Sequence, residues 1–201
     1  ISTMKGSDTL FWQIYNYTRT HNPTSSSYYD WLDQHIDLKN YTDYFIVETY
    51  CNNDDWIGYW TNNIRMWNPT KAGGKLKYLL EDLDMGFGYG GLSVSTDRLT
   101  LLRNPVPPST CYSSDIIDTI LYNPAYKRYF INRYADLINT IYLSDSLDKI
   151  AYPIRDSIAN DMIYHFQKWG SSDSTWRGYI EDMRTWYKRR PSIVRNQLVS
   201  Q

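Results

Sequence analysis

Two short apolar runs, Ile64–Trp67 and Lys75–Leu80, are separated by a loop that contains Asn68–Pro69 and Gly73–Gly74. Apolar runs of this length, bounded by glycine and proline, predict two strands joined as a hairpin. Polar, acidic segments lie on both sides of the pair. A hairpin brings its two ends together, so the fold is constrained to place these two acidic segments near each other.

The acidic segment after the hairpin has two carboxylates one residue apart, Asp82 and Asp84, followed by glycines from Gly86 onward. In a strand, residues i and i+2 share a face, and two acids on one face repel each other unless a cation or hydrogen bonds hold them. Carboxylate oxygens of this kind suit Mg²⁺ or Mn²⁺. A plain turn before the glycines is the alternative that this motif leaves open.

The segment before the hairpin runs from Asn52 to Trp56 and is followed by the pair Asn62 and Asn63. The hairpin can therefore set Asp55 and the two asparagines beside the two downstream carboxylates. We expect all of these side chains to lie around one cleft, close enough to share a cation.

These motifs occur in an order that resembles the spore-coat protein H (CotH) kinase family. The matching segments are Asn53–Trp56, Asn62–Trp67, Asp82–Gly88 and Asn123–Tyr134. The resemblance extends from about Tyr28 to the region of Arg190. It implies an α+β, mainly helical fold: a divergent protein-kinase-like C-lobe whose small β-hairpin carries the acidic motifs. It also implies transfer of phosphate from ATP to Ser or Thr of secreted or coat proteins.

The resemblance also implies roles for individual residues. Asp55 matches the catalytic aspartate, although its neighbour Asp54 competes for that role. Phosphoryl transfer further needs oxygen ligands for the metal that bridges the phosphates, which is Mg²⁺ or Mn²⁺ together with ATP. The implied cofactor-binding residues are Asn62 and Asn63, and the implied metal ligands are Asp82, Asp84 and Asn63.

Two departures from the family pattern bear on these roles. Five residues, Ile57 to Thr61, separate Trp56 from the asparagine pair, whereas the family usually has a shorter stretch here. Thr61 stands where the family often has glycine. No glycine-rich phosphate loop and no lysine on an early strand precede Asp55. We therefore expect the chain to be a carboxy-terminal lobe whose partner is the N-terminal nucleotide lobe of the same parent protein, and to be inactive in isolation because it binds ATP poorly alone.

Composition sets outer bounds on fold and partners. With 201 residues, 42% hydrophobic and 21% charged, the chain is globular, and we expect one domain over residues 1–201. A net charge of −1 argues against nucleic acid as a partner. No apolar run is long enough to cross a bilayer. We expect an extracellular, cell-surface or spore-coat location, and a surface or coat protein as substrate.

Two other classes of function stay open at this point. The 20 tyrosines and 8 tryptophans are compatible with a carbohydrate-binding module. A non-catalytic coat or surface scaffold that keeps its acids only for folding is the other class. The two cysteines, Cys51 and Cys111, are interpreted as unrelated thiols, with a disulfide as the alternative.

Capping residues and apolar periodicity predict the helices. We expect helices that begin at Ser7 or Asp8, at Asp37, at Pro124 and at Asp173, and another that passes through Ile150 and Phe166. The last of these is expected to start or bend at Pro153 and to stop at Gly170, and the helix from Asp173 to end at Pro191. The segment from Tyr89 to Pro108 is expected to be rich in loops and is a candidate activation segment or substrate loop.

Overall fold

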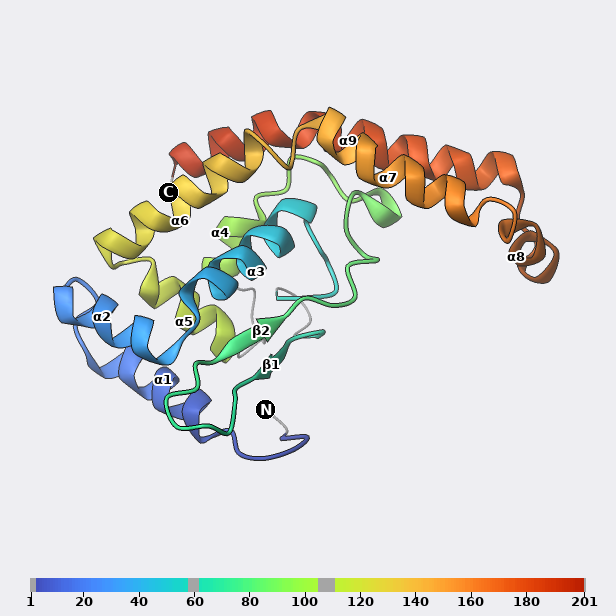
Figure 1. Ribbon diagram of the computed structural model, residues 1–201. Helices are drawn as coiled ribbons and strands as arrows, with labels where there is room; N and C mark the ends of the chain where they lie inside the picture. The colour runs from blue at the N-terminus through green and yellow to red at the C-terminus, as the bar shows by residue number, and fades with distance from the viewer. Residues whose placement is uncertain (1–2, 58–61, 105–110, 201) are drawn as a thin grey trace. The chain divides into compact units, whose positions relative to one another are not determined.

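The computed structural model describes residues 3–57, 62–104 and 111–200, which are mainly helical (Figure 1). The elements are α1 (Thr9–Thr20), α2 (Ser26–His35), α3 (Leu38–Cys51), β1 (Arg65–Trp67), β2 (Lys77–Leu79), a short 3₁₀ turn (Tyr89–Gly91), α4 (Arg98–Arg103), α5 (Tyr112–Ile120), α6 (Pro124–Ile138), α7 (Ser144–Ile158), α8 (Met162–Trp169) and α9 (Asp173–Val199).

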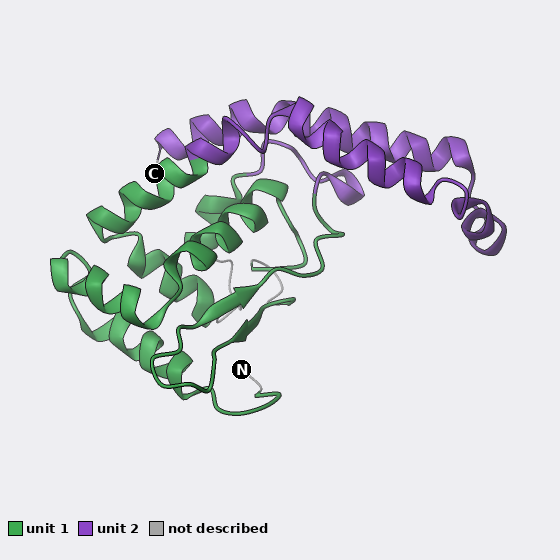
Figure 2. Cartoon of the chain, viewed as in Figure 1, with its two compact units in different colours: residues 1–86, 97–134 green, residues 87–96, 135–201 purple. Residues whose placement is uncertain are grey.

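The chain divides into two compact units (Figure 2). Unit 1 comprises residues 1–86 and 97–134, and unit 2 comprises residues 87–96 and 135–201. The expectation of a single domain stays a prediction, and each unit is described by itself below.

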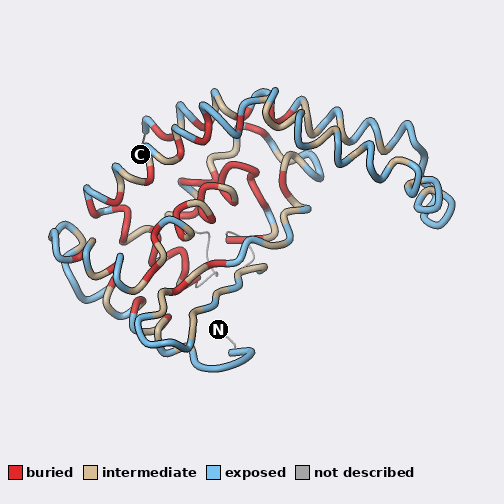
Figure 3. Tube along the Cα trace, in the orientation of Figure 1, coloured by how far each residue is buried: buried red, intermediate tan, exposed pale blue. Residues whose placement is uncertain are grey.

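Helix α3 forms the centre of unit 1, and buried positions concentrate along it (Figure 3). Its N-terminal cap is Asp37, as predicted, and the Asp37 carboxylate accepts a hydrogen bond from the Asn40 backbone at 3.1 Å. Leu38, Tyr41, Tyr44 and Phe45 on this helix are buried, whereas Val47 is only partly buried. A helix that is buried on most of its surface needs few polar positions, so any charged residue on it requires an explanation.

The predicted hairpin is present as an antiparallel pair, with Met66 opposite Tyr78. Asn40 attaches it to α3, because the Asn40 side chain accepts from the Tyr78 backbone N–H at 2.7 Å and donates to the Tyr78 carbonyl at 3.1 Å. An amide side chain that replaces a neighbouring strand in this way satisfies the backbone of β2. The start of α3 therefore determines where the hairpin lies.

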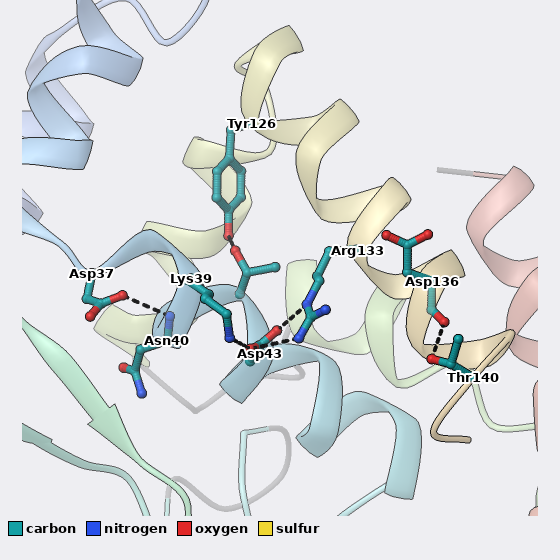
Figure 4. A network of polar contacts seen from close by, with 9 residues as sticks. Asp37, Lys39, Asn40, Asp43, Tyr126, Arg133, Asp136 and Thr140 are labelled. Carbon is teal, nitrogen blue, oxygen red and sulfur yellow. Dashed lines mark hydrogen bonds and ion pairs between the residues drawn. The ribbon is translucent and has the colours of Figure 1, made fainter. Parts of the chain in front are cut away.

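A second set of polar contacts joins α3 to α6 (Figure 4). Asp43 accepts hydrogen bonds from Arg133 at 2.7 and 3.1 Å and from Lys39 at 2.7 Å. The buried hydroxyl of Thr42 is 2.9 Å from that of Tyr126. These contacts attach α3 to α6, whereas Asn40 attaches it to the hairpin. Helix α3 is therefore fixed to both of these neighbours.

In unit 2, α9 runs along α7 and α8 (Figure 2). The hydrophobic core of unit 2 contains Val94, Trp186 and Tyr187. Among the interactions of the buried Arg190 are hydrogen bonds to the carbonyls of Val94 and Thr96, at 2.6 and 2.9 Å.

The structure corrects several predicted helix boundaries. Pro191 lies inside α9 and does not end it. Val194 and Leu198, beyond the proline, are buried, and this packing outweighs the one backbone hydrogen bond that proline removes. The single helix expected up to Gly170 is two helices, α7 and α8, and Pro153 lies inside α7.

Two further helices lie in segments that were not predicted to be helical. Helix α2 begins at Ser26 and was not predicted, and α4 lies within the segment expected to be loop-rich. The end of that segment, residues 105–108, lies outside the described residues. Both cysteines are buried thiols that form no disulfide, so the disulfide alternative is wrong.

Candidate functional site

The first acidic loop begins where α3 ends. Asn52 is the C-cap and takes the left-handed conformation, with φ 58°. Asparagine tolerates this conformation better than most residues do. The turn sends the next three residues away from the helix axis and toward the loop that follows the hairpin.

Asp55 lies against the two asparagines that precede β1. Its Oδ2 atom accepts from Asn62 Nδ2 at 2.9 Å and from Asn63 Nδ2 at 3.1 Å, and its carbonyl accepts a further bond from Asn63 at 3.2 Å. Among the described residues, Oδ1 of Asp55 accepts no hydrogen bond. The structure therefore brings Asp55, Asn62 and Asn63 together, with one carboxylate oxygen held and one available.

Asp54 has a different environment. Its Oδ1 accepts from Arg98 Nη2 at 2.7 Å, and Arg98 Nε donates to Asn52 Oδ1 at 2.9 Å. The Arg98 side chain is only 4% exposed and that of Asp54 49%. Asp54 thus neutralises a buried cation, whereas the side-chain contacts of Asp55 are with neutral amides.

The second acidic loop follows β2, which ends at Leu79. Asp82 and Asp84 lie beyond the strand and are exposed, and Asp82 has a φ of 54°. The prediction that the two acids share one face of a strand is therefore wrong, because a left-handed residue breaks the period of two. The segment is a turn that carries two exposed carboxylates.

The two acidic loops nevertheless meet. Asn53 Nδ2 donates to the Asp82 carbonyl at 3.3 Å, and the Asp54 backbone N–H to the Met85 carbonyl at 3.4 Å. A Cβ at Gly86 would lie 3.3 Å from the carbonyl oxygen and Cβ of Cys51. Glycine at this position lets the second loop approach the end of α3 closely.

The carboxylate and amide oxygens of the two loops are of the kind that hard cations prefer. The described residues hold no group of three or more His, Cys, Asp or Glu side chains that could hold a metal ion. The expectation that Asp55, Asp82 and Asp84 share one cation therefore stays a prediction. Mg²⁺ is commonly bound by one or two carboxylates together with substrate phosphates and water, and Asp82 and Asp84 are two exposed carboxylates on one loop.

A groove of about 600 Å³ lies elsewhere in unit 1, lined by residues that include Gln13, Gln34 and Lys75. None of the acidic-loop residues line it. The acidic loops and this groove are therefore separate features. We assign the candidate site from the side chains of the loops and not from the groove.

Glu48 and Arg98 belong to this region, and the sequence did not point to them. Glu48 lies on α3 and is fully buried; burial raises its pKa to about 7, although the bond from Asn53 and the charge of Arg98 act in the opposite direction. The signal that could have revealed Glu48 is a single acid within the apolar run Tyr44–Cys51. Arg98 is one of two arginines in a short polar-apolar stretch, which carries no comparable signal.

We expect Asp54→Ala to destabilise unit 1 while leaving the Asp55 environment intact. Removing the carboxylate leaves the Arg98 guanidinium buried without its charged partner, and a hydrogen bond to a charged group contributes about 1.5–3 kcal/mol. Chemical denaturation should show a loss of this size. Asp84→Ala is the matched control, because an exposed carboxylate should change stability by less than about 0.5 kcal/mol. Equal stability of both variants would contradict the structural role of Asp54.

The fold and the site define the class: a mainly helical protein in which two hydrogen-bonded acidic loops, joined by a two-stranded hairpin, present a carboxylate held by amides. A family model described as CotH kinase protein matches residues 4–194. The chain belongs to this family and is a kinase-like protein.

Comparison with curated proteins gave no match, and neither did comparison with solved structures. The kinase-like C-lobe architecture therefore stays a prediction beyond the helical fold and hairpin. Among the described residues, no helix is both long and apolar enough to cross a membrane.

Proposed function

We propose that this chain carries a phosphotransferase site that transfers the γ-phosphate of ATP to Ser or Thr hydroxyls of a protein. The observation that carries the proposal is the environment of Asp55, whose Oδ2 is held by Asn62 and Asn63 while Oδ1 accepts no hydrogen bond among the described residues. Membership in a kinase family supports the same chemistry.

Asp55 is the base or orienting carboxylate for the acceptor. As the hydroxyl oxygen attacks the γ-phosphorus, its proton passes to Asp55, and the bond from phosphorus to the bridging oxygen breaks so that ADP leaves. The two amide donors restrict rotation of the carboxylate and direct Oδ1 toward the acceptor. We assign Asp54 a structural role instead, because its Oδ1 is paired with the buried guanidinium of Arg98.

Asp82 and Asp84, with the amide oxygen of Asn63, are the residues that would hold Mg²⁺ or Mn²⁺. When bound, such an ion neutralises the charge of the ATP phosphates. Asn62 is the second amide near the nucleotide. The exposure of both carboxylates leaves them accessible to a metal–nucleotide complex.

The acceptor is proposed to be a surface or coat protein, outside the cell or in the spore coat. The association of the CotH family with the spore coat supports this proposal. The N-terminal nucleotide lobe of the same parent protein is the proposed partner that completes the ATP site.

The proposed metal role predicts that Asp84→Ala abolishes transfer of labelled phosphate and weakens metal-dependent nucleotide binding, since a charged metal ligand is lost. The assay uses the full-length protein with ATP, a Ser- and Thr-containing acceptor, and either Mg²⁺ or Mn²⁺. Glu81→Ala is a matched control in the same loop, because Glu81 pairs with Arg65 at 2.6 Å and should be dispensable. Full transfer by the Asp84 variant would exclude the metal assignment, and absence of transfer in the unmodified protein would exclude the proposed function.

A further inference from the structure

Glu48 is a buried acid with no role in the proposed transfer step. It lies on α3, four residues before the C-cap, with none of its surface exposed. Its Oε2 accepts from Asn53 Nδ2 at 2.9 Å, and its Oε1 has no hydrogen-bond partner among the described residues. Burial of a carboxyl group in this state is unfavourable, and an apolar residue of similar size would fill the same space without that cost.

The partner of Glu48, Asn53, is the residue that connects the two acidic loops. Besides the bond to Glu48, its Nδ2 donates to the Asp82 carbonyl at 3.3 Å, and its Oδ1 accepts from the Asp55 backbone N–H at 3.2 Å. An amide can donate two hydrogen bonds through its nitrogen, and both are used. Fixing the Asn53 amide plane therefore fixes the Asp55 backbone and the Asp82 carbonyl together.

We infer that Glu48 is a positioning residue for the candidate site: through Asn53 it sets the relative placement of Asp55 and the Asp82–Asp84 loop. The inference rests on the proposed function for its effect on catalysis, but not for its effect on loop geometry. Without the Glu48 acceptor, the Asn53 amide is free to rotate about its side-chain torsions, and the acceptor for the Asp55 N–H moves with it. Displacement of a catalytic group by about 1 Å can cost on the order of 100-fold in rate.

The variants separate positioning from general stability. Glu48→Gln keeps an oxygen that accepts from Asn53, whereas Glu48→Leu keeps approximate volume but removes the acceptor. Asn53→Ala removes the connecting amide itself. Thr42→Val is the matched control, because it removes a buried hydrogen bond from the same helix, to Tyr126 on α6 and not to a residue of the acidic loops.

The first measurement is hydrogen exchange of the backbone amides of Asp54 and Asp55 in the full-length protein, which needs no activity. Glu48→Leu and Asn53→Ala should each reduce protection at both amides by about tenfold or more, since loop opening becomes easier. Glu48→Gln should restore protection close to that of the unmodified protein, and Thr42→Val should leave it unchanged. Unchanged protection in both Glu48→Leu and Asn53→Ala would overturn the inference.

The second measurement is transfer of labelled phosphate by the same variants. We expect Glu48→Leu to reduce kcat by about 10- to 100-fold, with a smaller effect on KM, and Glu48→Gln to recover most of the rate. The inference would also be overturned if Glu48→Leu and Glu48→Gln both lost the rate of transfer while hydrogen exchange stayed unaltered in both variants. If the unmodified protein transfers no phosphate while the exchange results hold, the proposed function fails and the positioning of the loops by Glu48 stands.

Discussion

Asp55→Ala is expected to abolish phosphate transfer while the protein stays folded and binds nucleotide. The carboxylate that accepts the proton of the acceptor hydroxyl is lost, and general-base catalysis contributes about 10²- to 10⁴-fold. Nucleotide binding should be largely intact, because a base contacts the acceptor and not the phosphates. Fold stability should hardly change, since Asp55 is partly exposed and its hydrogen-bond donors, Asn62 and Asn63, are exposed or partly exposed.

The neighbouring acid provides the control for this experiment. Asp54→Ala should retain transfer but lower stability, because Asp54 pairs with the buried Arg98. The two adjacent substitutions should therefore have opposite effects on activity and stability. Steady-state transfer of labelled phosphate and chemical denaturation, measured on both variants, test the pair. Retained activity in the Asp55 variant together with lost activity in the Asp54 variant would assign the base to Asp54.

The stability of unit 1 is expected to fall between about pH 4.5 and pH 7 because of Glu48. Burial raises the pKa of Glu48 from 4.5 to about 7, so the folded state holds the proton more tightly than the unfolded state does. The stabilisation from this group is complete below pH 4.5 and is lost as the pH rises through about 7. At about 1.4 kcal/mol per pKa unit, the total change is roughly 3 kcal/mol.

Glu48→Gln isolates this contribution, because the amide cannot titrate. The free energy of unfolding of the variant, relative to the unmodified protein, should rise by roughly 3 kcal/mol between pH 4.5 and pH 8. The ionisable groups that interact with Glu48 are Arg98 and Tyr44. Neither changes its charge in this range: arginine stays protonated, and burial raises the pKa of Tyr44 far above it. A constant difference between the two proteins across this range would show that Glu48 keeps an ordinary pKa.

Local sequence signals predicted the elements whose formation depends on nearby residues. The Asp37 cap, the proline at the start of α6 and the hairpin of β1 and β2 all follow from backbone preferences and side-chain periodicity within a few positions. The prediction that the last helix ends at Pro191 was wrong. Whether proline ends a helix depends on how the residues beyond it pack, and a local signal does not contain that information.

The sequence by itself determined that two acidic segments flank a hairpin, and the order of its motifs resembled the family that a match over residues 4–194 then established. Only the tertiary structure decided how the adjacent acids differ. Asp54 pairs with Arg98, 44 positions away, whereas Asp55 contacts the asparagines before β1. It also revealed that the buried Glu48 accepts a hydrogen bond from Asn53, the residue that joins the two loops. The environment of a charged group is set by burial and by partners distant in sequence, and neither can be read from its immediate neighbours along the chain.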